Sequence, residues 1–201
     1  MGTELVESKP LVQLTAGEIR RINELAEYRT SAKVNKEQVG IMGEDIPETS
    51  ETDEEMRDAV KEIHTVGAVG EYAFAKFYDF PFPYSPEGEI DGGFDFIVEI
   101  PNGDWLTVDV KTTIHWNGNL ILQSYKDVNA DLYVLVNYDK EENHARLNGM
   151  VAGDVFAESP IKSGKYSIPS YEYKPDNLVN VFDPEDVEIV EPERYKEKVI
   201  A

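Results

Sequence analysis

Cysteine is absent from the 201-residue chain. Without thiols the protein cannot form disulfides, Fe–S clusters or thiolate zinc sites. Histidine is scarce too, and the three histidines, His64, His115 and His144, are widely separated in the sequence. Metal chemistry based on sulfur or clustered imidazole is therefore not expected.

Long apolar runs are also missing. No run reaches the roughly 18 residues that a transmembrane helix needs, and the acidic start, MGTELVESKP, has no apolar stretch typical of a secretory signal. Hydrophobic residues make up 41% of the chain and aromatic residues 10%, which is typical of a globular protein. We expect a cytoplasmic protein with no membrane partner, large enough for one domain with a sizeable core.

Basic residues are few, 19 against 40 acidic ones, and the net charge is −21. Nucleic-acid binders usually present a basic face, so one interpretation is that the protein avoids nucleic acid. The other is a high-salt cytoplasm, where acidic surfaces keep proteins soluble and charges are strongly screened. Acidic residues occur along the whole chain and no segment is compensatingly basic, which favours a salt-adapted (halophilic) organism or its virus.

The first third of the chain predicts two helices. Residues 1–13 are expected to be a tail or peripheral segment. Thr15 and Glu18 fit a capping box, and apolar spacing predicts a helix over 16–33. Residues 40–55, rich in acidic residues, are expected to be a solvated loop. A second helix is predicted from Asp53, in which the small residues Gly67 and Gly70 allow close packing against a sheet.

The middle of the chain carries the strongest β pattern. Apolar residues alternate over 94–100 and 105–113, and Asn102-Gly103 between them is a hairpin signal. Further strands are expected at 119–125, 131–138, 145–152 and 178–182, with a short helix near 153–157. The segment 131–138 is nearly all apolar, which is typical of a central strand buried on both faces.

Asp109 and Lys111 lie two residues apart on a predicted strand, so their side chains leave the same face. In a hairpin, directly paired residues share a face, and their residue numbers add up to a constant. Asp95 therefore lies on the face of Asp109 and Lys111 only if that constant is even. A three-residue loop would do this, pairing Asp95 with Lys111 and Ile97 with Asp109. The apolar residues of both strands are all even-numbered, which independently favours an even sum. We therefore predict an odd loop or a bulge.

Carboxylates that converge on one face repel each other unless a cation lies between them. Oxygen ligands suit Mg²⁺ or Mn²⁺. A lysine beside such an ion can orient water or stabilise charge on a phosphoryl group. Asp95, Asp109 and Lys111 thus supply what phosphodiester hydrolysis requires.

Three motifs carry a resemblance to a family: Gly70-Glu71 on a helix, GGFDF at 92–96 and VDVKTT at 108–113. Together they resemble the PD-(D/E)XK nuclease superfamily, over about residues 60–140. The resemblance implies an α/β (α+β) restriction-endonuclease-like core, with a central mixed sheet flanked by helices in the order αβββαβ. Residues 1–55 would be an N-terminal helix and acidic-loop extension and 56–201 the nuclease-like domain, within one compact domain overall. Phe94 stands where many members have proline.

The resemblance also implies roles for individual residues. Asp95 and Asp109 would bind Mg²⁺ (or Mn²⁺), Lys111 would be the catalytic lysine, and Glu71 and the Val110 carbonyl would be further ligands. Some of these residues also have a purely structural interpretation. Asp109 and Lys111 can form a simple surface ion pair, and Glu71 can be an exposed helix residue.

Other residues near this constellation are weaker candidates. Gln123 and Lys126 are predicted to contact phosphate, and His115 to lie just outside the ligand shell, although an ordinary surface role fits them as well. Trp105 and Trp116 can stack on bases or belong to the core or its rim.

The leading hypothesis is a metal-dependent DNA nuclease. A homodimer is one expected arrangement, because paired subunits are common where both DNA strands are cut. The alternative is an inactive protein of the same fold that uses its acidic surface to bind a protein or to mimic nucleic acid. A structural Ca²⁺- or Mg²⁺-binding protein is a third reading, but the sequence lacks a D-x-D-x-D-G loop.

Overall fold

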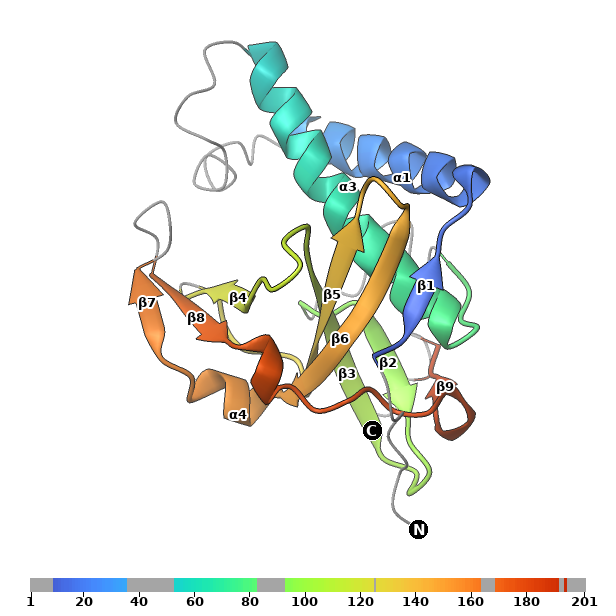
Figure 1. Cartoon of the computed structure of the whole chain (residues 1–201), viewed down its shortest axis with the longest axis vertical. Helices are drawn as coiled ribbons and strands as arrows, with labels where there is room; N and C mark the ends of the chain where they lie inside the picture. Colours follow the sequence, from blue (N-terminus) through green and yellow to red (C-terminus); the bar gives the residue numbers. More distant parts are fainter. Residues whose placement is uncertain are drawn as a thin grey trace.

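The computed structural model describes residues 9–35, 53–82, 93–124, 126–163, 169–191 and 194. It is a mixed α+β protein with two sheets (Figure 1). The larger sheet has the strand order β1-β6-β5-β3-β2-β9, and its strands are β1 (Leu11–Gln13), β2 (Phe96–Glu99), β3 (Trp105–Thr113), β5 (Leu132–Asp139), β6 (His144–Ala152) and β9 (Glu188–Ile189). The smaller sheet has the order β4-β8-β7, built from β4 (Leu120–Gln123), β7 (Ile161–Ser163) and β8 (Pro169–Tyr173).

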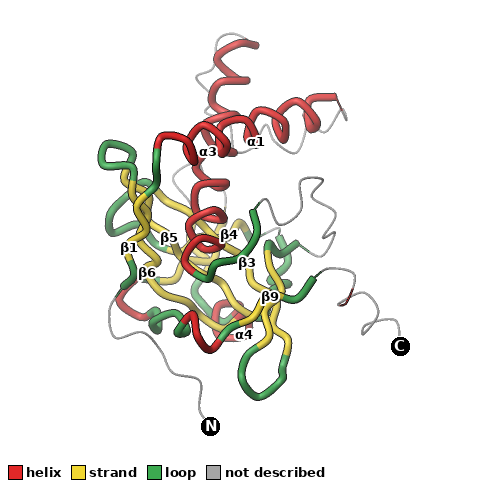
Figure 2. Tube along the Cα trace, turned by 90° about the vertical axis from the view of Figure 1, so that its right-hand side faces the viewer, coloured by secondary structure: helices red, strands yellow, loops and turns green. Residues whose placement is uncertain are grey.

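Two long helices, α1 (Ala16–Asn35) and α3 (Asp53–Phe77), lie across each other, and α3 also runs along the larger sheet (Figure 2). The predicted capping box at the start of α1 is confirmed. The Glu18 carboxylate accepts hydrogen bonds from the backbone N–H (2.6 Å) and hydroxyl (2.8 Å) of Thr15, and the Glu18 N–H donates to the Thr15 hydroxyl (3.3 Å). The same carboxylate accepts from Lys76 and Tyr72 of α3, so the cap of one helix also joins it to the other.

Helix α3 approaches the sheet most closely at Gly70. A Cβ placed on Gly70 would lie 1.8 Å from the Thr112 hydroxyl oxygen of β3. Only a glycine therefore allows this packing distance, as the sequence predicted. Gly67, the other small residue predicted to permit close packing, has open space around it and does not serve this purpose.

The β2–β3 hairpin keeps the predicted face but not the predicted register. Phe96 pairs with Val108 and Glu99 with Trp105, so paired numbers have an even sum and the connecting loop has five residues, 100–104. The loop is odd, as predicted, but the predicted pairing of Ile97 with Asp109 was wrong by two residues, because Ile97 pairs with Thr107. Gly103, with φ of +83°, makes part of the turn beyond Asn102. The even-numbered side chains form the core under α3: Phe96, Val98, Val108 and Val110.

Strand β5 is central and buried along nearly its whole length, which confirms the prediction from its apolar sequence. It pairs with β3 in parallel, with Asp109 opposite Tyr133 and Lys111 opposite Leu135. The start of this pairing is fixed by Asp131, whose carboxylate accepts from the N–H and hydroxyl of Thr107 (both 2.8 Å). In the described part of the β3–β5 connection there is a strand, β4, and no helix, which differs from the expected αβββαβ order.

Two short segments differ from their predictions. Residues 11–13, expected to be a tail or peripheral segment, form the edge strand β1, because β6 offers it an unpaired edge. Residues 178–182 were predicted as a strand but form only isolated bridge positions, at Val179, which pairs with Met150, and at Phe182. The predicted helix at 153–157 is confirmed as α4 (Gly153–Ala157).

Parts of other predictions fall outside the described residues: the first eight residues, the acidic loop apart from its last residues, and Gly92 of the GGFDF motif. Among the described helices none is long and apolar enough to cross a membrane.

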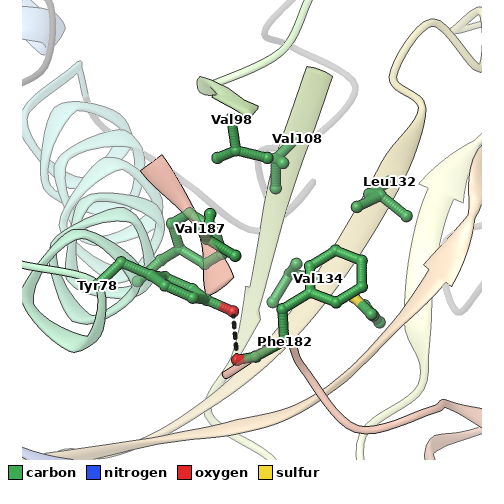
Figure 3. Close-up of a pocket in the computed structure, with 9 residues that line it drawn as sticks. Tyr78, Val98, Val108, Leu132, Val134, Phe182 and Val187 are labelled. Atoms are coloured by element: carbon green, nitrogen blue, oxygen red, sulfur yellow. Dashed lines mark hydrogen bonds between the residues drawn. The ribbon is translucent and has the colours of Figure 1, made fainter. Parts of the chain in front are cut away.

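A small cavity of about 10 Å³ remains between α3 and the sheet (Figure 3). Apolar side chains line it, among them Val98, Val108 and Val134, and the Tyr78 hydroxyl at its side donates to the Phe182 carbonyl oxygen. A space this small with apolar walls is at or below the size that holds one water molecule. It is therefore a packing defect of the core and offers no room for a ligand.

The contact at Gly70 makes a direct stability prediction. Gly70→Ala should lower the free energy of unfolding by about 1–3 kcal/mol, because α3 must move away from Thr112. Gly67→Ala is the matched control and should stabilise the protein by up to about 1 kcal/mol, because alanine is the better helix former. Urea denaturation of both variants measures this. Equal effects at the two positions would mean that α3 does not lie this close to β3.

The Glu18 cap gives a pH-dependent prediction. Burial opposes ionisation of Glu18, but hydrogen bonds from Lys76, Thr15 and Tyr72 outweigh burial and lower its pKa to about 2. A carboxyl whose pKa is lower in the folded state stabilises the fold above its unfolded pKa, near 4.3, and loses this effect as the pH falls towards 2. Glu18→Gln should therefore reduce stability at neutral pH, by about 0.5–2 kcal/mol for a lost cap. The difference from wild type should disappear near pH 2, and a difference constant from neutral to acid pH would contradict the argument.

Candidate functional site

Asp95, Asp109 and Lys111 come together at one position of the larger sheet. Asp95 directly precedes β2, whose first residue, Phe96, pairs with Val108 of β3. The Asp95 N–H donates to the Val108 carbonyl oxygen (2.8 Å), and its carboxylate accepts from the Val110 N–H (2.7 Å). The acid just before β2 is thus fixed across β3 by its backbone and its side chain.

Asp109 and Lys111 form a close ion pair. The Lys111 Nζ lies 2.7 Å from Asp109 Oδ1, and their side chains are 33% and 7% exposed. Asp109 is therefore a buried carboxylate, whereas the lysine reaches solvent. A fully exposed surface pair, the ordinary reading of this spacing, would show both side chains in water.

Glu71 reaches the same region from α3, next to the close contact at Gly70. Its two carboxylate oxygens accept hydrogen bonds of 2.8 Å from the guanidinium of Arg29 in α1, and its side chain is only 14% exposed. Glu71 is therefore not an ordinary exposed helix residue. It faces Asp95 closely enough to influence its ionisation.

Of the acids at the site, Asp95 has an environment that opposes its ionisation. Burial, followed by the negative charges of Glu71 and Asp109, raises the pKa of Asp95 well above its usual value, and Lys111 and the Val110 N–H only partly offset this. A carboxyl with a pKa raised by its neighbours marks a place where another positive charge would be stabilising.

Lys111 is held in its charged form. Burial alone would lower its pKa, but the charges of Asp109 and Asp95 outweigh burial and raise it.

Tyr133, opposite Asp109 on β5, is buried beside this pair; burial raises its pKa, and Asp109 adds to the effect. The Tyr133 hydroxyl oxygen accepts from the N–H groups of Asn129 and Ala130, which fixes the ring on the strand next to Asp109.

The remaining sequence candidates lie on β4 and in the segments that follow β3 and β4. Gln123 ends β4 in the smaller sheet, and Lys126 is exposed in the following turn. His115 is exposed after β3, where its N–H donates to the Thr113 hydroxyl and its carbonyl oxygen accepts from Asn137. Their suggested roles near phosphate stay predictions.

No three His, Asp or Glu side chains of the described residues are arranged as a ready metal-binding group. Arg29 contacts both carboxylate oxygens of Glu71, and Lys111 contacts one carboxylate oxygen of Asp109. A hollow of about 410 Å³ lies between α1 and the end of α3, lined by residues such as Arg21, Tyr72 and Phe82. It is not lined by Glu71, Asp95, Asp109 or Lys111.

Two residues of the site were missed by sequence reasoning. Arg29 is one basic residue among several on α1, and no spacing in the sequence relates it to Glu71. Tyr133 had a weak signal, because it is a polar-tipped residue in a strand that is otherwise nearly apolar. Its relation to Asp109 depends on the parallel register, which the sequence does not reveal.

The raised pKa of Asp95 makes the wild type less stable as the pH rises. A carboxyl that binds its proton more tightly when folded stabilises the fold fully below its unfolded pKa, near 3.9, and loses this as the pH rises through the folded pKa. In EDTA, Asp95→Asn should therefore unfold at higher urea than wild type at neutral pH, and the gain should shrink below about pH 4. Asp127→Asn, at an exposed position, should show no such trend. A less stable Asp95→Asn at neutral pH would argue against a charge conflict at Asp95.

The resemblance noted in the sequence rests on the motif residues alone. Comparison of the chain with protein-family models, with curated proteins and with solved structures gives no match in any of the three.

Proposed function

We propose that the protein is a magnesium-dependent nuclease that hydrolyses DNA phosphodiester bonds at Asp95, Asp109 and Lys111. The observation that carries this proposal is the convergence of Asp95, Asp109 and Lys111: the Asp95 carboxylate accepts from the Val110 N–H (2.7 Å), and Lys111 Nζ lies 2.7 Å from Asp109 Oδ1. Three acids and a lysine gathered where α3 meets the β2–β3 hairpin are costly for stability alone. They suit a site that takes up a cation and an anionic substrate.

The donor set fits Mg²⁺ or Mn²⁺. Magnesium is commonly bound through one or two carboxylates, with waters and substrate phosphate completing the shell. Asp95 and Asp109 would supply the carboxylates and Val110 its carbonyl oxygen. Glu71 would act as a further ligand after release from Arg29. When bound, the ion would supply Lewis-acid stabilisation of phosphoryl charge and a more acidic bound water.

The protein's own groups would then position the reactants. Lys111 is kept protonated by Asp109 and Asp95, so it would act as a cation that orients the attacking water or stabilises phosphoryl oxygen, and not as a base. Arg29, once released from Glu71, would offer a second cation to the phosphate. Tyr133, the partner of Asp109 on β5, would help to hold Asp109 in place.

The fold supports the proposal in its order of elements. Helix α3 with Glu71 precedes the hairpin β2–β3 that carries Asp95, Asp109 and Lys111, and β5 follows parallel to β3. We propose that this is a restriction-endonuclease-like core in which β4 and the smaller sheet stand where a helix was expected. The net charge of −21 fits a DNA-binding role only if screening is strong, so we place its activity at high salt.

The proposal is tested by cleavage of plasmid and linear DNA with Mg²⁺ or Mn²⁺, at low and high KCl. Lys111→Ala should lower the cleavage rate by about 100- to 1000-fold, as for loss of one charge-stabilising donor. Lys140→Ala is the matched control, because Lys140 is exposed and pairs with Glu62 on the surface. Activity should be greater at high KCl. Identical rates for wild type and Lys111→Ala would remove Lys111 from the mechanism.

A second candidate function is an inactive nuclease fold that binds a partner through its acidic surface. The ion pairs Arg29–Glu71 and Lys111–Asp109 favour it, because they neutralise the site without a metal. Calorimetry separates the two proposals. The nuclease should bind Mg²⁺ and lose most of this binding in Asp109→Asn, whereas the inactive module should bind none.

A further inference from the structure

The sheet face that carries Asp109 and Lys111 continues beyond them toward the carboxyl end of β3. Thr113 pairs with Asn137 of β5, and Asn137 pairs with Arg146 of β6, so Arg146 shares this face with Lys111. From the spacing of residues along and between strands, Lys111 and Arg146 are roughly 12 Å apart along the sheet. Two basic side chains therefore lie on one face of a strongly acidic protein.

Trp116 covers the end of this face. It lies in the loop after β3, is 51% exposed, and has the Arg146 guanidinium stacked 3.6 Å from the centre of its ring. An Arg146 Nη2 donates to the Trp116 carbonyl oxygen (3.2 Å), and the ring of His144 meets it edge-on at 6.4 Å. Because Arg146 covers one face of the indole, we take the other face to be the exposed one.

Arg146 lacks a negative partner. No carboxylate of the described residues lies within salt-bridge distance of it, and its Nε atom is buried without a hydrogen-bond acceptor. Burial lowers the pKa of Arg146, and no neighbouring acid compensates for that burial. The Asn137 Oδ1 atom beside it is also buried without a partner. In a chain with 40 acidic residues, a half-buried arginine that pairs with none of the described acids is suited to an external anion.

We infer that Trp116 and Arg146 form a binding site for an unpaired nucleotide of DNA, with the base stacked on the exposed face of Trp116 and a neighbouring phosphate held by Arg146. This inference rests on the proposed function and gives its substrate: DNA with a single-stranded segment next to the cleaved bond.

Stacking is the reason for choosing single-stranded DNA. An aromatic side chain can stack on any base whose face is open, and this contributes about 1–3 kcal/mol per base. Inside a duplex both faces of a base are already covered by its neighbours. Arg146 behind the ring adds a positive charge that attracts the phosphates on either side of the stacked base.

Tryptophan fluorescence in EDTA tests binding without cleavage. In a Trp105→Phe background, emission comes from Trp116 alone. Adding oligothymidylate should quench it, whereas a blunt duplex of equal length should quench much less. Equal quenching by both probes, or none by oligothymidylate, would overturn the inference.

Binding variants give the second measurement, by fluorescence anisotropy of labelled oligothymidylate. Trp116→Ala should bind about 5- to 150-fold more weakly, Trp116→Phe should keep most of the affinity, and Trp105→Phe should match wild type. Circular dichroism confirms that each variant is folded. Unchanged affinity in folded Trp116→Ala would overturn the inference.

The two proposals fail in different ways. If wild type cleaves DNA and Lys111→Ala does not, but Trp116→Ala binds normally, the nuclease proposal stands and the stacking site is wrong. If Trp116 binds oligothymidylate but no metal supports cleavage, the stacking site stands as a binding site and the nuclease proposal is wrong.

Discussion

The contact between Gly70 and Thr112 fixes how close α3 lies to the larger sheet, and the candidate site depends on that distance. With no side chain at Gly70, the helix backbone rests directly on β3, so Glu71 reaches the carboxylates at the start of the hairpin. Helix α1 then packs on α3 and brings Arg29 to Glu71. One missing Cβ thus places two charged residues from separate helices beside Asp95.

The charges at the site balance only in part. Glu71 and Asp109 each have a cation, Arg29 and Lys111, whereas Asp95 accepts one backbone N–H, and the charge of Lys111 only partly offsets those of Glu71 and Asp109. Because Arg29 comes from α1, the N-terminal segment contributes directly to this balance. A division at residue 55 into an extension and a nuclease-like domain would separate Arg29 from the acids that it serves.

Sequence reasoning located the local structure well, because that structure depends on short-range patterns. The Thr15–Glu18 cap, the strand at 105–113 and the shared face of Asp109 and Lys111 all follow from spacing within a few residues. Parity placed Asp95 on that face, yet the register was wrong by two residues, because parity distinguishes odd loops from even ones but not three residues from five. Arg29 and Tyr133 were not found, because their relation to the site arises from helix crossing and parallel strand pairing, which leave no local signal.

The five-residue loop at 100–104 limits how this chain can vary over evolution. Each strand alternates its side chains between two faces, so a single inserted or deleted residue would move every later side chain of β3 to the opposite face. Val108 and Val110 would then lie on the face that Asp109 and Lys111 now occupy, and Asp109 and Lys111 would enter the apolar core beneath α3. Related chains that keep the site are expected to change this loop in steps of two residues, or to compensate a single step with a bulge.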